Sequence, residues 1–142
     1  MAILFSEQTV KARLTNKLRL KSFIKNLFQR EGQGVRHLQY VFCTDAFLLE
    51  INKQFLQHDT YTDIVTFELS DDPLETEGEI YISVDRVKEN ADQYNTSYER
   101  ELHRVIFHGA LHLCGFGDKS EEESNIMREK EEEYLNLYFP VS

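Results

Sequence analysis

The chain has 142 residues, of which 41% are hydrophobic and 29% are charged, and its formal net charge is -9. This length suits one globular domain over residues 1–142, which can bury a core without cross-links. No apolar run approaches the roughly 18 residues of a membrane span, and the N-terminus lacks the basic segment of a secretory signal, so we expect a cytoplasmic protein with no membrane partner.

The acidity is unevenly distributed along the chain. Residues 1–36 carry a net charge of +6, whereas the remaining 106 residues carry -15. Lys17, Lys21 and Lys25 recur at four-residue spacing, opposite the apolar residues of a helix predicted for 17–30, and form a basic stripe. Such a stripe can bind the phosphates of RNA even on an acidic protein, although a solvated helix face is the simpler interpretation.

The apolar periodicity predicts nine elements in the order β-α-β-α-β-β-α-α-α. Taken along the chain, this order favours an α/β or α+β fold in which about four strands are packed by about five helices. The expected strands cover residues 2–5, 36–43, 63–69 and 79–84, and the expected helices cover 17–30, 44–55, 85–94, 96–113 and 120–138.

Local signals predict the helix ends. Thr96 and Glu99 have the spacing of a capping box, as do Ser120 and Glu123, so each pair should open a helix. In the helix predicted for 44–55, the inward positions should be Leu48, Ile51 and Phe55. The last helix is strongly acidic and is most simply a solvated face, with contact to basic ribosomal proteins as the alternative.

A candidate metal site lies at the end of the helix 96–113. His108 and His112 are four residues apart, so their imidazoles lie on one helix face. Gly115 and Gly117 permit the chain to turn back and bring the carboxylate of Asp118 to them. Two histidines and one carboxylate suit a single zinc ion with an open position for water, although the same set can hold non-haem Fe(II).

The neighbouring residues limit the chemistry of this site. Gly109 stands where a helical metalloprotease carries its general base, so a hydroxide would have to form on the metal unaided. Cys114 points away from the histidine face, and it and Cys43 are expected to be free thiols, with Cys43 buried. His103 should have a surface or structural role, and Arg104 is expected to be solvated rather than to reach the site.

The metal segment resembles the signature of the YbeY family of bacterial endoribonucleases and ribosomal RNA maturation factors. The resemblance covers about residues 36–137 and implies a zincin-like fold with a mixed sheet, one zinc ion per chain, and hydrolysis of small-subunit ribosomal RNA in the cytoplasm. The matching segments are His-Gly-Ala-Leu-His-Leu-Cys-Gly at 108–115, Asn-Lys-Gln-Phe at 52–55, Thr-Asp-Ile-Val-Thr-Phe at 62–67 and Gly-Glu-Ile-Tyr-Ile-Ser at 78–83.

The chain departs from the family pattern at three positions. Asp118 stands where the family's third ligand is usually His, and Gly117 replaces the Asp before it. Leu56 replaces an Arg that is thought important for activity, and His58, two residues on, is a weak candidate to contact phosphate in its place.

Three hypotheses follow from the residues and the resemblance. The leading one is a metal-dependent endoribonuclease whose lysine stripe holds the RNA backbone without reading its sequence. The second is a ribosome-assembly or RNA-binding protein with a structural metal, which the missing arginine and the missing general base favour. The third, an Fe(II) oxygenase, is suggested by the ligand types alone.

Overall fold

The computed structural model describes residues 2–56, 62–72 and 74–140. Its elements follow the predicted order and are β1 (Ala2–Glu7), α1 (Lys17–Arg30), β2 (Val35–Cys43), α2 (Asp45–Leu56), β3 (Ile64–Glu68), β4 (Thr76–Ser83), α3 (Val84–Gln93), α4 (Tyr98–Leu113) and α5 (Glu121–Tyr138).

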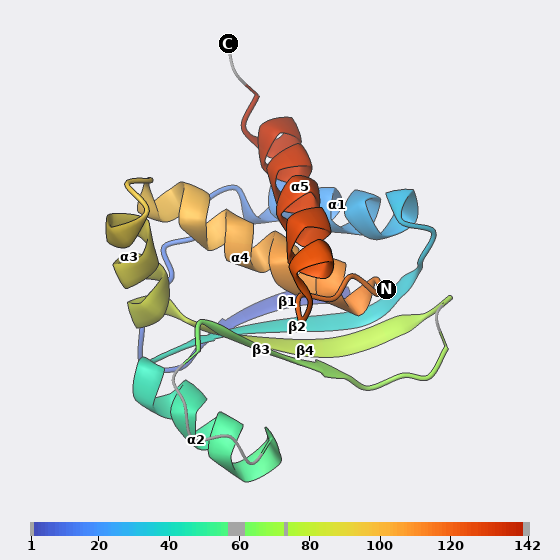
Figure 1. The fold of residues 1–142 in the computed structure, drawn as a ribbon. Coiled ribbons are helices and arrows are strands. Elements are labelled where there is room, and N and C mark those ends of the chain that lie inside the picture. Colours follow the sequence, from blue (N-terminus) through green and yellow to red (C-terminus); the bar gives the residue numbers. More distant parts are fainter. Residues whose placement is uncertain (1, 57–61, 73, 141–142) are drawn as a thin grey trace.

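The strands form one mixed sheet in the order β1-β2-β4-β3. β2 is parallel to both of its neighbours, β1 and β4, whereas β3 is antiparallel to β4. Helices α1, α4 and α5 lie over one face of the sheet, and α2 lies on the other (Figure 1). The predicted fold class, a four-stranded mixed sheet packed by five helices, is therefore confirmed.

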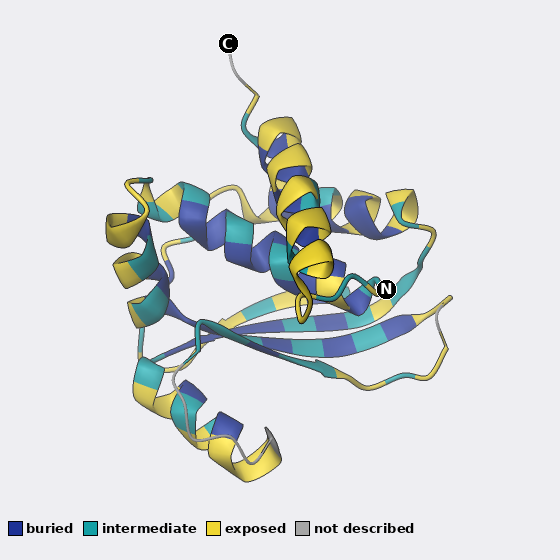
Figure 2. Cartoon of the chain, in the orientation of Figure 1, coloured by how far each residue is buried: buried dark blue, intermediate teal, exposed yellow. Residues whose placement is uncertain are grey.

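Helix α4 lies between the sheet and α5, in the main hydrophobic core. Figure 2 shows a stripe of buried residues along α4 and the alternation of burial along the strands. In β4 the buried residues include Gly78, Ile80 and Ile82, which alternate as the pleat of a strand requires. The Tyr40 hydroxyl of β2 donates a 2.9 Å hydrogen bond to the Ile106 carbonyl, so this helix is anchored to the sheet by a polar contact as well.

The other face of the sheet carries a smaller apolar cluster under α2, formed by Cys43, Leu48 and Val65. Burial of Cys43 and the free state of both cysteines are as predicted. The inward prediction for Phe55 is wrong, because the residue is 62% exposed, although its ring makes an edge-on contact with Phe67 of β3.

One of the two predicted capping boxes is present. The Ser120 hydroxyl accepts a hydrogen bond from the Glu123 amide, and the Glu123 carboxylate accepts one from the Ser120 amide. At α4 the prediction for Thr96 is wrong, because the N-cap is the next residue, Ser97, whose hydroxyl accepts from the Arg100 amide. Adjacent hydroxyl residues offer the helix two starts, and the observed start places the acidic Glu99 and Glu101 in the first turn, as the helix dipole favours.

No helix among the described residues is long and apolar enough to span a membrane.

Candidate metal centre

The turn after α4 brings Asp118 back toward the helix, as predicted. Gly115 adopts a φ of +104°, in the left-handed region that a residue without a Cβ reaches at little cost. Its amide donates to the His112 carbonyl and the Phe116 amide donates to the Leu111 carbonyl, which together close a Schellman motif. The reversal of the chain at this motif leaves Asp118 three residues from α5.

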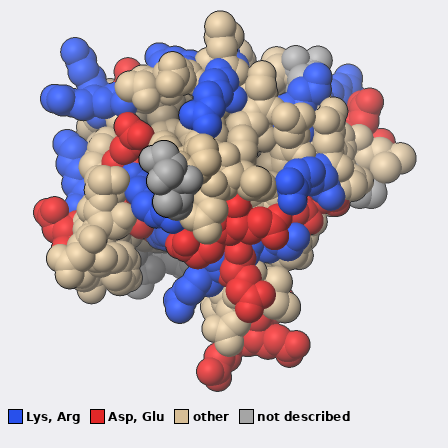
Figure 3. All heavy atoms as spheres, turned by 90° about the horizontal axis from the view of Figure 1, so that it is seen from above, with Lys and Arg blue, Asp and Glu red and all other residues tan. Residues whose placement is uncertain are grey.

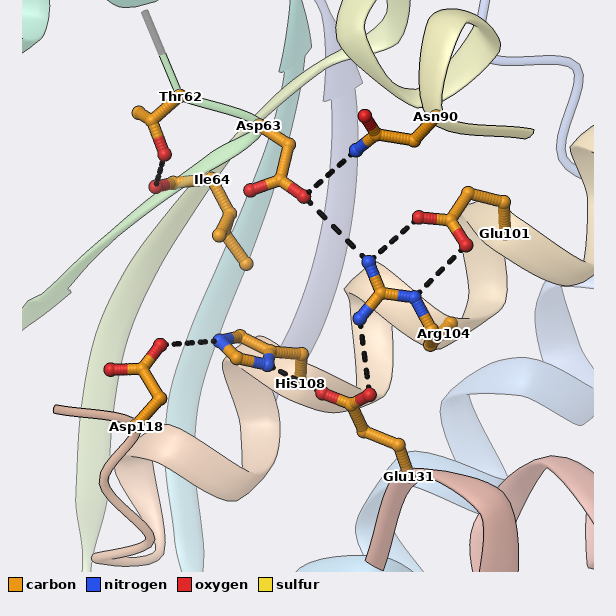
Figure 4. A network of polar contacts seen from close by, with 9 residues as sticks. All are labelled: Thr62, Asp63, Ile64, Asn90, Glu101, Arg104, His108, Asp118 and Glu131. Carbon is orange, nitrogen blue, oxygen red and sulfur yellow. Dashed lines mark hydrogen bonds and ion pairs between the residues drawn. The ribbon is translucent and has the colours of Figure 1, made fainter. Parts of the chain in front are cut away.

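His108 is held between two carboxylates that come from different elements (Figure 4). Its Nδ1 lies 2.6 Å from Glu131 Oε2 on α5, and its Nε2 lies 3.4 Å from Asp118 Oδ2 on the turn. The His108 side chain is only 17% exposed, whereas that of Asp118 is 47% exposed. His108 Nε2 therefore faces the more open, solvent-reached side of the site.

His112, the remaining predicted ligand, lies in the last turn of α4 and is exposed. Within the described part of the chain, no three His, Cys, Asp or Glu side chains are grouped closely enough to hold an ion. The structure thus brings His108 and Asp118 together and leaves His112 one turn away, and the three-residue ligand set stays a prediction.

Arg104, one turn before His108, is not solvated as predicted. Its guanidinium lies 2.9 and 2.7 Å from the two Glu101 oxygens, 3.0 Å from Glu131 and 3.7 Å from Asp63. Glu101 and Glu131 are 2% and 5% exposed, so this guanidinium pairs with two carboxylates that are buried. The prediction failed because two of these partners, Glu131 on α5 and Asp63 before β3, lie far from Arg104 along the sequence.

Negative charge is in excess around His108. Figure 4 shows four carboxylates in the network, those of Asp63, Glu101, Asp118 and Glu131, against the single guanidinium of Arg104. An uncompensated cluster of this kind is costly in a partly buried setting and is relieved by a cation. The donors present, an imidazole nitrogen and a carboxylate oxygen, are of the types that zinc takes, although the described side chains form no group of three around one point.

The titration of these groups follows their contacts. Burial lowers the pKa of His108, but the hydrogen bond to Glu131 and the charges of Glu131, Asp118 and Asp63 outweigh it and raise that pKa above its ordinary value. Burial raises the pKa of Glu131, but contacts with His108 and Arg104 lower it overall. Each group thus favours the charged state of the other.

Cys114 follows the last turn of α4 as a partly buried free thiol. Burial, with a smaller contribution from the Glu31 carboxylate, raises the pKa of its thiol to about 12. The thiolate is the form that binds metals, and it is scarce at neutral pH under these conditions.

Glu131 is the residue of this site that the sequence analysis missed. The acidic helix was predicted to be a solvated face, which is wrong at Glu131, although Glu133 does lie outside and pairs with Arg30. A signal was present, because Glu131 falls at helical spacing in the buried stripe of α5, four residues after Met127 and three before Tyr134. A charge on the apolar face of a helix predicts a buried partner.

His103 has a structural role, one of the two that were expected. Its ring is 2% exposed and stacks on Tyr138, with Phe139 against its edge. Its Nδ1 lies 2.7 Å from the Glu99 carbonyl, and burial is the main cause that lowers its pKa. It therefore packs α4 against the end of α5, away from His108.

Two other predicted groups lie apart from the site or outside what is described. Lys17 and Lys25 are exposed on α1, and Lys21 lies 5.8 Å from the centre of the Phe5 ring on β1, the edge strand farthest from β3. His58 lies outside the described residues, so its predicted phosphate contact has no structural test here.

The surface seen from above separates the two signs of charge. In Figure 3 acidic side chains form a band and a projection, and basic side chains lie around them. The first turn of α5 is acidic, and Glu121 and Glu122 in it are exposed.

Comparison with known proteins gives a consistent result. The family model described as Endoribonuclease YbeY matches residues 4–138. Proteins of that description in Cytophaga hutchinsonii and Bacteroides thetaiotaomicron are 40% and 42% identical to this chain. The first match covers 95% of this chain and 94% of the relative, and the second covers 96% and 99%.

A solved structure shares the fold. The solution structure of TM1509 from Thermotoga maritima is 30% identical in sequence, with a TM-score of 0.67 over 95% of this chain and 87% of that one.

Proposed function

This chain belongs to the endoribonuclease YbeY family and is an endoribonuclease, and we propose that it hydrolyses RNA with one zinc ion held by His108, His112 and Asp118. The observation that carries the metal proposal is the pairing of His108 Nε2 with Asp118 Oδ2 while His108 Nδ1 is taken by Glu131. The Nδ1 atom of His108 is thus occupied by the buried Glu131, and the Nε2 atom faces the carboxylate of Asp118, which is partly exposed to solvent.

The separation of these two atoms supports a shared ion. Two ligand atoms about 2.0–2.1 Å from a tetrahedral zinc ion lie about 3.4 Å apart, and His108 Nε2 lies 3.4 Å from Asp118 Oδ2. His112 follows His108 by one turn of the same helix, within reach of a common ion once its ring turns toward Asp118.

The residues around the ion would do the binding and positioning. A bound zinc ion supplies a Lewis acid for a phosphate oxygen and lowers the pKa of a coordinated water molecule. Asp118 and the two histidines would hold that ion at the end of α4, and Arg104 neutralises part of the buried carboxylate charge beside His108. The carboxylates of the network outnumber its one guanidinium, so they repel an RNA phosphate. A bound cation would offset this repulsion.

A purely structural metal receives no support from these observations. Helix α4 is already held by the core and by the Tyr40 hydroxyl, independently of Asp118. The candidate ion would sit at an exposed turn rather than between elements that need it in order to pack.

The proposal extends, on the family resemblance, to the substrate and its setting. We propose that the RNA is small-subunit ribosomal RNA and that the protein works in the cytoplasm during ribosome maturation. Zinc is preferred to Fe(II), and elemental analysis of protein purified without oxygen distinguishes the two, since one equivalent of iron would replace zinc in the proposal.

The substitution Asp118→Ala tests the proposed function. We expect loss of single-stranded RNA cleavage and of the bound ion, measured by mass spectrometry of the native protein, with an unchanged circular dichroism spectrum. Asp92→Ala, at an exposed position of α3, is the matched control and should keep both properties. Cleavage and metal content that survive Asp118→Ala would refute the site, and unfolding on metal loss would favour a structural metal.

A further inference from the structure

Glu131 is a carboxylate on the buried face of α5 whose two oxygens have different partners. Oε2 lies 2.6 Å from His108 Nδ1, and Oε1 accepts a 3.0 Å hydrogen bond from Arg104 Nη1. The residue is 5% exposed. Because both oxygens are engaged and solvent is nearly excluded, the carboxylate has one orientation.

Arg104 fixes that orientation from α4. Its Nε and Nη2 donate to the two oxygens of Glu101 at 2.9 and 2.7 Å, which leaves Nη1 for Glu131. The guanidinium is planar and its donors have a fixed spacing, so the bidentate contact with Glu101 also sets where Nη1 points. Glu131 is therefore held in place by a group that is itself held by a third residue.

This arrangement decides which nitrogen of His108 carries the proton. An ionised carboxylate only accepts hydrogen bonds, and Glu131 already accepts one from the Arg104 guanidinium, whose positive charge favours the ionised form. His108 Nδ1, 2.6 Å away, must then be the donor. In a neutral imidazole the other nitrogen, Nε2, has no hydrogen and offers a lone pair, on the side where Asp118 lies.

We propose that Glu131 is a positioning residue that holds His108 in its Nδ1–H tautomer and so presents Nε2, together with Asp118, to a divalent metal ion. The inference rests on the metal site proposed above and deepens it. Carboxylates behind ligating histidines fix the ring and increase the basicity of the nitrogen that binds, and their loss typically weakens metal affinity by about 10- to 100-fold.

A merely structural role for Glu131 makes different predictions. If the carboxylate served only to pair with Arg104, its removal would alter stability and leave the tautomer of His108 and the metal affinity unchanged. The deciding measurements are therefore made on the ring and on the ion, rather than on RNA cleavage.

The test compares the wild type with Glu131→Ala and with Glu133→Ala, a control on the same helix whose carboxylate pairs with Arg30 at the surface. The zinc dissociation constant, from competition with a chromophoric chelator, should rise about 10- to 100-fold in Glu131→Ala and stay unchanged in Glu133→Ala. Glu131→Gln, which preserves the volume, replaces Glu131→Ala if that variant does not fold, and should show a smaller rise of the same sign.

Nitrogen-15 spectra of the metal-free protein give a second measure that needs no ion. At alkaline pH, where the imidazole is neutral, His108 of the wild type should carry its proton on Nδ1, and Glu131→Ala should lose that preference. A wild-type proton on Nε2, or an unchanged zinc constant in Glu131→Ala, overturns the inference. If the wild type binds no zinc, the proposed function fails, and the spectra alone decide whether Glu131 sets the tautomer.

Discussion

Gly109 lies so close to Ile80 that helix α4 has no room for a side chain at this position. A Cβ built on Gly109 would stand 2.9 Å from Ile80 Cγ2 on β4 and 2.9 Å from Ile64 Cδ1 on β3. Gly109 is the residue at which a helical metalloprotease carries its general base, and here that position faces the sheet and not the metal site. The missing Glu is thus a consequence of how closely α4 packs on the sheet.

The substitution Gly109→Ala should destabilise the fold. Ile80 is fully buried, and its Cγ2 is bonded directly to Cβ. This methyl group therefore cannot move away from the methyl group that the substitution adds without a change of rotamer in a packed core. Overpacking costs about 1–3 kcal/mol, and the better helix propensity of Ala returns about 1 kcal/mol. We therefore expect the free energy of unfolding, measured with urea, to fall by up to about 2 kcal/mol. Gln29→Ala, on an exposed position of α1, should leave it nearly unchanged, and an equal effect of both would contradict the packing argument.

The order of the elements was predictable because each signal is local. Apolar residues at helical spacing in 17–30 and 98–113, and alternation in 35–43, lie within one element and need no knowledge of its neighbours. The cap at Ser97 and the exposure of Phe55 were missed because they are not decided locally. The choice between two adjacent capping residues, and the burial of a side chain in the last turn of α2, depend on which elements pack nearby.

The candidate site was predictable only in part. His108 and Asp118 lie ten residues apart in one helix and its turn, so sequence spacing brings them together. Glu131 and Asp63 join them through the packing of α5 and of the segment before β3, which spacing along α4 does not reveal. Arg104 was expected in solvent because its contacts with Glu131 and Asp63 cannot be predicted from the sequence of α4 alone.

Removing Arg104 should be costly. Arg104→Met keeps most of the side-chain volume but removes the guanidinium from two buried carboxylates, Glu101 and Glu131, whose side chains are 3% and 6% exposed. Breaking a buried pair from one side typically costs about 3–5 kcal/mol. The matched change Arg100→Met removes a more exposed pair with Glu132 and should cost about 0–1 kcal/mol. Thermal unfolding of both variants measures the difference, and similar losses would show that the buried network adds little.

Stability of the metal-free protein should depend on pH through His108 and Glu131. The pKa of His108 is raised in the fold, so its contribution is complete below the ordinary value of 6.5 and is lost as pH rises through the higher folded value. The pKa of Glu131 is lowered from 4.5, so its contribution is complete above that value and is lost as pH falls through the lower folded one. The pair thus stabilises most between about pH 4.5 and 6.5.

Unfolding by urea in the presence of a chelator, repeated across this range, measures the effect. Glu131→Gln should flatten the decline of stability on the alkaline side of pH 6.5, because His108 then loses its charged partner. A decline of the same steepness in wild type and variant would assign it to other groups.

Charge reversal of the stripe Lys17, Lys21 and Lys25 tests whether RNA reaches α1. The stripe lies beside β1 and the metal site lies beside β3, at opposite edges of the four-stranded sheet, so only an RNA long enough to cross the molecule can contact both. Each phosphate contact adds about 0.7 to the dependence of log affinity on log salt for a single strand. If all three lysines contact RNA, replacing them with Glu should reduce that slope by about 2.

Reversal of Arg36, Lys53 and Lys88 changes the net charge equally at other places and serves as the control. Equal slopes for the two triple variants, measured by fluorescence anisotropy on one long RNA, would make the stripe an ordinary solvated helix face.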